Sequence, residues 1–135
     1  MAIFENLSNY KNLGLLIIRI GLGAMFIYHG VPKLAGGPEH WVKIGSAMKA
    51  VGIDYAPAFW GFMAAVTETF GGLLLLIGLL FRPVCILLLI NLIVAALMHF
   101  SKGAGLEGAA HAIEDAIVFL GLIFIGPGLY SIDKK

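Results

Sequence analysis

Four long apolar stretches separated by short polar segments dominate the pattern of this chain. They cover residues 13–31, 57–81, 83–100 and 109–125. A bilayer core of about 30 Å is crossed by about 17–25 mostly apolar residues in a helix, and all four stretches fall in that range. Because lipid offers no hydrogen-bond partners, a spanning segment must pair its own backbone groups. The pattern therefore predicts four transmembrane helices.

Proline and glycine indicate where these helices begin and end. Pro32 is expected to stop the first helix, and Pro57 lies at the favourable first turn of the second. The segment 81–83, "FRP", leaves almost no loop between the second and third helices, which predicts a tight antiparallel hairpin. The glycines and proline at 126–128 stop the fourth helix.

The longer link between the first two spans has a different pattern. Trp41, Ile44, Met48 and Val51 recur at helical spacing after the start signal at 37–38. This predicts a short amphipathic helix lying in the membrane interface, with Trp41 at headgroup level. A loop helix docked on the bundle is the alternative. The predicted fold is thus all-α: one membrane domain over residues 1–135, a four-helix bundle with a short interfacial helix between helices 1 and 2.

Composition supports a lipid environment. Hydrophobic residues make up 60% of the chain and charged residues 13%, against roughly 25% charged in a soluble domain. A net charge of +1 provides no concentrated basic face and argues against nucleic-acid binding. Four spans put both termini on one side. Arg82 in the tightest turn and the charged tail at 133–135 favour the cytoplasm for that side.

Ionisable groups inside membrane spans usually face a bundle interior, and this chain has several. At a rise of 1.5 Å per residue, one set falls at about 9–20 Å from the side of the termini: Arg19, Glu68 and Glu114, with Asn91 as a neutral companion. A second set falls at about 24–26 Å, near the far surface: His29, His99 and His111. The polar groups therefore predict two layers.

Purely structural explanations exist for some of these residues. Arg19 and Glu68 would form a buried ion pair that joins two helices. Lys33, four residues after His29, fits a helix-end charge reaching the headgroups. Three histidines at one depth, backed by carboxylates, are harder to explain without a function.

The favoured function is redox chemistry on a quinone. A quinone head is a flat apolar ring with two carbonyl oxygens, and it suits an apolar pocket with a few donors. Its reduction needs protons, which histidine and buried carboxylates supply. The chain has no GxGxxG motif and a single cysteine, Cys85, so a partner or a redox cofactor must supply the electrons.

Three alternatives stay open. The three histidines are also possible ligands of a metal or a haem, which an absorption spectrum of the pure protein would reveal. A non-catalytic membrane subunit or chaperone would use the buried charges only as structural contacts. A small transporter is a weaker alternative, because the chain shows no internal repeat.

Four segments in order resemble the DoxX family of small bacterial membrane proteins. They are "RIGLGAMFIYHGVPKL", "TETFGGLLLLIGLLFRP", "NLIVAALMHFSKG" and "GPGLYSID", and the resemblance covers roughly residues 13–133. The resemblance implies a four-helix protein of the bacterial inner membrane. Some relatives form the small subunit of a thiosulfate:quinone oxidoreductase, and others are described as quinol oxidase-like.

The family's helix-1 arginine, helix-2 glutamate and late helix-3 histidine fall on Arg19, Glu68 and His99, and its G-x-x-K turn on Gly30 and Lys33. The combined hypothesis is a quinone- or quinol-interacting component of a membrane oxidoreductase, with a larger redox subunit or a second copy of the chain as possible partners. Its catalytic candidates are Glu68, His99 and Glu114. Its quinone-binding candidates are His29, His99, His111, Arg19 and Asn91, with Arg19 holding Glu68 ionised. No metal site is predicted.

Overall fold

The structure is a computed structural model that describes residues 3–135. Within these residues all regular elements are helices, so the all-α prediction is confirmed. In chain order they are the 3₁₀ helix η1 (Glu5–Tyr10), α1 (Lys11–Ala35), α2 (Gly37–Gly45), the 3₁₀ helix η2 (Ser46–Val51), α3 (Pro57–Ile77), α4 (Phe81–Ser101) and α5 (Gly105–Ile125).

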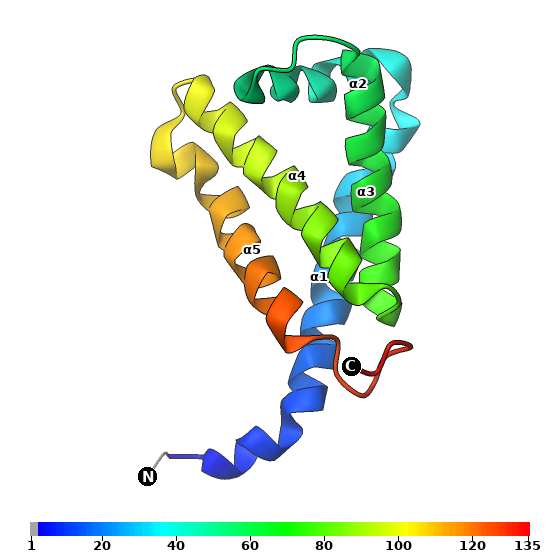
Figure 1. The fold of residues 1–135 in the computed structure, drawn as a ribbon, viewed down its shortest axis with the longest axis vertical. Coiled ribbons are helices and arrows are strands. Elements are labelled where there is room, and N and C mark those ends of the chain that lie inside the picture. The colour runs from blue at the N-terminus through cyan, green and yellow to red at the C-terminus, as the bar shows by residue number, and fades with distance from the viewer. Residues whose placement is uncertain (1–2) are drawn as a thin grey trace.

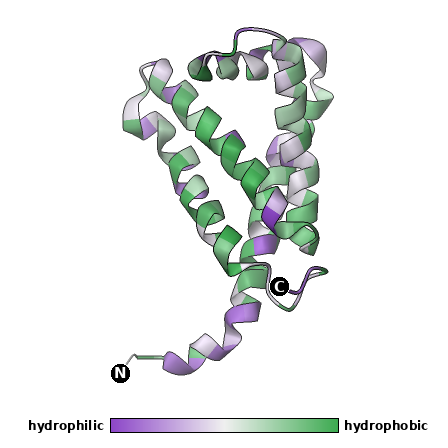
Figure 2. Cartoon of the chain, in the orientation of Figure 1, coloured by the Kyte–Doolittle hydropathy of each residue, from purple (hydrophilic) through white to green (hydrophobic). Residues whose placement is uncertain are grey.

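Four of the helices among residues 3–135 are long and apolar enough to cross a bilayer. They are α1, α3, α4 and α5, which correspond to the four predicted spans. Hydrophobic residues cover much of the length of these helices, most continuously on α4 and α5 (Figure 2). The predicted four-helix membrane bundle is therefore confirmed, and the chain is a multi-pass membrane protein.

The bundle consists of two closely packed helix pairs (Figure 1). In one pair α1 packs along α3, in the other α4 packs along α5, and α3 joins the pairs through its contact with α4. Phe81, Leu75, Leu88 and Phe119 are fully buried where the helices converge. Both termini lie at the same end of the bundle, as four spans require (Figure 1).

Small residues let α1 and α3 come into backbone contact. A Cβ added at Gly72 would lie 2.8 Å from the carbonyl oxygen of Gly23, and Gly30 lies directly against Thr69. Such close approach is how helices associate in lipid, where burial of apolar surface provides no driving force. These contacts fix the register of the two helices, so that the region around Gly30 is level with the region around Thr69.

Pro32 does not end the first helix, contrary to the sequence-based prediction. Helix α1 continues for three more residues to Ala35, with Pro32 inside it. Proline is tolerated inside membrane helices more often than in soluble ones. The indole nitrogen of Trp41 donates to the carbonyl oxygen of Lys33 at 3.0 Å, which pairs one of the carbonyl groups in the last turn of α1. The continuation keeps Lys33 helical and one turn after His29.

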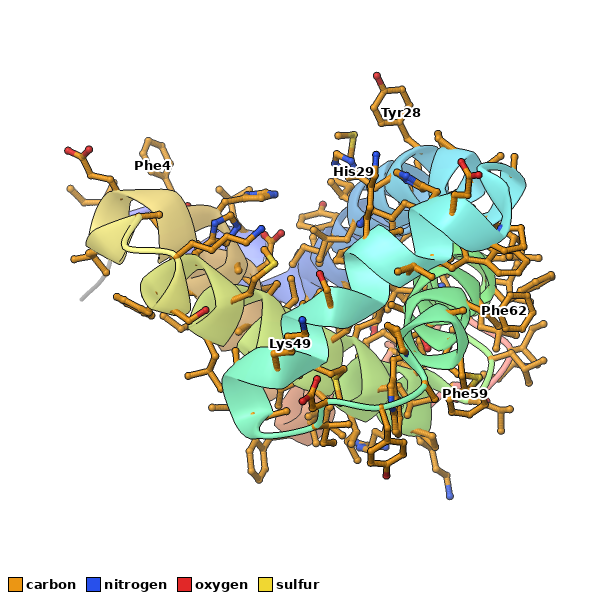
Figure 3. The ribbon with its side chains drawn as sticks, turned by 90° about the horizontal axis from the view of Figure 1, so that it is seen from above. Phe4, Tyr28, His29, Lys49, Phe59 and Phe62 are labelled. Carbon is orange, nitrogen blue, oxygen red and sulfur yellow. The ribbon has the colours of Figure 1, made fainter. Side chains whose placement is uncertain are left out.

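The predicted short helix between spans one and two is present as α2 and η2. These segments cross the end of the bundle opposite the termini, from α3 towards α4 (Figure 3). Gly45 on α2 lies against the backbone of Pro57, and Gly61 on α3 lies against the backbone of Trp41. Helix α2 is therefore docked directly on α3.

The C-terminal segment closes the other end of the bundle. The carboxylate of Asp133 accepts hydrogen bonds from the backbone N–H groups of Leu80 and Phe81, at 3.1 and 2.7 Å. A carboxylate at a helix N-terminus satisfies otherwise unpaired donors and opposes the helix dipole. The guanidinium of Arg82 donates to the carbonyl oxygens of Ile123 and Lys135. The tail thus links the start of α4 to the end of α5.

Candidate functional site

A cavity of about 290 Å³ lies among all four long helices, in the half of the bundle nearer α2. Its apolar lining consists of Leu22, Met25, Phe26, Leu92, Ala95, Gly108 and Ala112. Its polar lining consists of His29, Lys33, Glu68, His99, His111 and Asp115. The structure therefore brings the three histidines of the predicted far layer, from α1, α4 and α5, to one cavity. Their chemical roles remain predictions.

Helical spacing explains why these residues share the cavity. On α1 the lining residues Leu22, Met25, Phe26 and His29 follow an i, i+3, i+4, i+7 pattern, which is one face of a helix. On α5 the same pattern begins at Gly108 and includes His111 and Asp115. Gly108, the first of these positions, lies next to His99 of α4. A Cβ there would lie 3.7 Å from the Nδ1 atom of that histidine.

An ion pair between Lys33 and Glu68 forms one wall of the cavity. The Lys33 ammonium lies 2.9 Å from each carboxylate oxygen of Glu68, and the amide of Asn91 donates to the same carboxylate at 3.1 Å. The Glu68 side chain is 11% exposed and that of Lys33 is 34% exposed. A buried carboxylate needs such partners, because an unpaired charge is costly away from water. Asn91 supports the site through Glu68 and does not line the cavity itself.

The predicted pairing of Arg19 with Glu68 is wrong. Arg19 is 1% exposed, but its guanidinium donates to the carbonyl oxygens of Leu76 and Tyr130 at the end of the bundle near the termini. The glycine contacts explain why. They set Gly23 level with Gly72, which places Arg19 one turn further towards the end of α3. Arg19 anchors the C-terminal segment and lies outside the cavity.

On α5 the carboxylate in the cavity is Asp115. Its side chain is 22% exposed and lies 3.6 Å from the Nε2 atom of His111, one helical turn earlier. Glu114, a predicted catalytic residue, is exposed and does not line the cavity. Adjacent helix positions point about 100° apart, so only one of the two acidic residues shares the face of His111.

Two contributors were missed as site residues. Lys33 was assigned to the headgroups, although its spacing of four from His29 placed both on one face of the helix. Side chains on a helix point back towards its N-terminus, which lets Lys33 reach down to Glu68. Asp115 is not among the predicted site residues, although its i, i+4 relation to His111 indicates that the two share a helix face.

The structure shows no pre-formed metal site in the part of the chain that it describes. Across residues 3–135, no group of three or more His, Cys, Asp and Glu side chains is arranged to hold a metal ion. The three histidines line the cavity from different helices without converging on one point. His40, the fourth histidine, is exposed on α2, away from the cavity.

Comparisons with known proteins define the class to which this membrane bundle belongs. The DoxX family model matches residues 14–101, so the chain is a member of the DoxX family. The match covers most of α1 and all of α2 to α4, including His29, Lys33, Glu68 and His99. Helix α5, with His111 and Asp115, lies beyond it.

Individual relatives extend the similarity over most of the chain. It is 31% identical to Rv3486, described as an uncharacterized membrane protein of Mycobacterium tuberculosis, over 87% of this chain and 78% of the relative. It is 29% identical to YqjF, described as an inner membrane protein of Escherichia coli, over 95% of each chain. A Haemophilus influenzae protein is 28% identical over 97% of this chain and 96% of its own length. No solved structure matches the chain.

Proposed function

We propose that the cavity binds the head group of a quinone or quinol, and that this chain is the quinone-interacting membrane component of an oxidoreductase system. The observation that supports this most strongly is the lining of one cavity by His29, His99 and His111 together with the Lys33–Glu68 pair. Small-molecule sites combine a mostly apolar wall with a few placed polar groups, and the cavity has this composition.

The size of the cavity suits one ring. Its volume of about 290 Å³ lies at the small end of ligand sites, which begin at about 300 Å³. Phe26, Leu92 and Ala112 offer apolar surface to the ring faces, and the histidines offer polar atoms to the ring edge. A long isoprenoid chain does not fit in the same space.

The residues of the chain would handle protons. A bound quinone accepts two electrons and two protons to become a quinol. Histidine is the side chain best suited to exchange protons near neutral pH, and its second nitrogen is oriented by a neighbouring acceptor. The carboxylate of Asp115 lies 3.6 Å from the Nε2 atom of His111, as a nearby acidic group and not as a hydrogen-bond partner. Lys33 and Asn91 hold the carboxylate of Glu68 in place at the cavity wall.

Electrons would come from a partner. The sequence carries one cysteine, Cys85, and no dinucleotide-binding glycine motif. A larger redox subunit in the same membrane would supply two electrons to each quinone. The similarity of this chain to an inner membrane protein of Escherichia coli supports the bacterial inner membrane as the location.

Binding measurements on purified protein in lipid nanodiscs test the proposal. The probe is decylubiquinone, and the variants are His99→Ala and Glu68→Gln. Each is expected to weaken binding by about tenfold or more, because a lost hydrogen bond to a buried polar group costs about 1–3 kcal/mol. His40→Ala is the matched control, since this exposed histidine lies outside the cavity. Wild-type affinity in both cavity variants, with the fold intact, would refute the proposal.

A further inference from the structure

We propose that ligands reach the cavity sideways from the bilayer, through a slot between α1 and α5. The ligand would therefore be a membrane-dissolved amphiphile with a flat hydrogen-bonding head and a long apolar tail. This inference rests on the proposed function and adds the route and the ligand class.

The slot is the one open seam in the ring of four helices, all of which the structure describes completely. Around the ring, α1 packs on α3, α3 on α4, and α4 on α5. Between α5 and α1 the ring is not closed, because no Cα atom of one helix lies within 8 Å of a Cα atom of the other. The two helix pairs are visible in Figure 1.

Exposure of the lining residues shows that the cavity opens at this seam. On α1, Met25 is 52% exposed and His29 is also exposed. On α5, the side chain of His111 is 78% exposed. On the opposite wall, Glu68 and Leu92 are each 8% exposed when the whole residue, backbone included, is considered. The accessible side of the cavity is therefore formed by α1 and α5, and the closed side by α3 and α4.

Access from the end of the bundle near the termini is obstructed. On that side of the cavity, Phe26 of α1 and Phe119 of α5 pack edge to face across the seam, with their ring centroids 5.4 Å apart. Both side chains are buried. At the other end, α2 and η2 contact α3 and α4, on the closed side of the cavity, and contribute no residue to its lining (Figure 3). In that view His29 lies on the side of α1 away from Phe59 and Phe62.

The outer edges of the slot are apolar and exposed. On α1, Ile18 lies two helical turns before Met25 on the same face and is 39% exposed. On α5, Val118 lies two turns after His111 and is 40% exposed. In a membrane helix such surface faces acyl chains. The cavity holds only a head group, so a tail attached to that head would leave through the slot and lie along these residues.

A bulky side chain at the slot tests the route. Met25→Trp narrows the slot at an already exposed position, and Met63→Trp is the matched control on α3, where Met63 is 42% exposed and outside the cavity. Binding of two probes to each variant is measured in nanodiscs: decylubiquinone and its tail-less parent, 2,3-dimethoxy-5-methylbenzoquinone. Because Met25 also borders the cavity, Met25→Trp will affect both probes, and we expect it to weaken decylubiquinone binding about tenfold more than tail-less binding, the scale of an overpacking penalty. Met63→Trp should match the wild type with both probes.

Each other result has a distinct meaning. Unchanged decylubiquinone binding in Met25→Trp, or equal losses for both probes, would overturn the lateral route and leave the cavity as a head-group site. Failure of the wild type to bind either probe would overturn the proposed function, and the lateral route with it.

Discussion

The ammonium of Lys33 lies 2.9 Å from both carboxylate oxygens of Glu68, which pairs a residue near the end of α1 with a residue in the middle of α3. The pair neutralises two charges at the wall of a cavity in a membrane domain. It also ties α1 to α3 next to the three histidines. The geometry of the site therefore depends on it.

Removing either partner of this pair should destabilise the fold, and removing Lys33 should cost more than removing the charge of Glu68. Lys33→Met leaves the 11% exposed Glu68 carboxylate with only Asn91, and we expect a loss of about 3 kcal/mol, the low end for a broken buried pair. Glu68→Gln should cost less, because Lys33 is 34% exposed and its ammonium can be solvated. Thermal unfolding in detergent measures both.

The double variant and a surface control complete this experiment. Lys33→Met combined with Glu68→Gln should be more stable than Lys33→Met alone, since no unpaired charge remains. Lys43→Met, at an exposed position on α2, should unfold like the wild type. Equal stability of Lys33→Met and the wild type would show that the pair contributes nothing to the fold.

Glycine-to-alanine changes should have opposite signs at two positions. At Gly72 a Cβ would meet the Gly23 carbonyl oxygen at 2.8 Å, so Gly72→Ala should push α1 from α3 and lower the unfolding temperature. At Gly121 on α5 a Cβ meets nothing within 4 Å. Gly121→Ala should therefore stabilise the protein, by up to about 1 kcal/mol from helix propensity. A stabilised Gly72→Ala variant would contradict the close packing of α1 on α3.

Arg19 should control the attachment of the C-terminal segment. Arg19→Met removes the hydrogen bonds to Leu76 and Tyr130, each of which is worth about 1.5–3 kcal/mol when the donor is charged. We expect faster protease cleavage of a C-terminal tag in this variant and little change in quinone binding. Lys11→Met, an exposed position on the same helix, is the control. Loss of quinone binding with an intact tail would place Arg19 in the site after all.

The helices could be predicted because their signal is local. Apolar runs long enough for a bilayer, the short turn before α4 and the spacing around Trp41 each lie within one segment. Counting along each span was also sufficient to place His29, His99 and His111 at one depth, since rise per residue is nearly constant in a helix.

The partners of the charged residues could not be predicted, because they depend on contacts between segments. The register of α1 on α3 is set by Gly23, Gly30 and Gly72. That register, together with the continuation of α1 past Pro32, brings Lys33 to Glu68. Arg19 binds backbone carbonyl groups, which every residue carries, so no sequence pattern marks its partners.

Both termini are predicted to face the cytoplasm, which would place the cavity towards the opposite side of the membrane. A C-terminal green fluorescent protein fusion should then be fluorescent in bacterial cells, and an alkaline phosphatase fusion at the same position should be inactive. The charges at 133–135 and Arg82 provide the basis for this prediction. An active phosphatase fusion would reverse the assignment.

The most direct test is an experimental structure of the protein in nanodiscs with saturating decylubiquinone. The account predicts a flat ligand among His29, His99 and His111, with a carbonyl oxygen at hydrogen-bond distance, about 2.6–3.2 Å, from one of their ring nitrogens. A closed, fully paired cluster without a ligand would contradict it. So would a ligand bound only at another surface, such as the apolar groove lined by Trp41, Phe59 and Phe62.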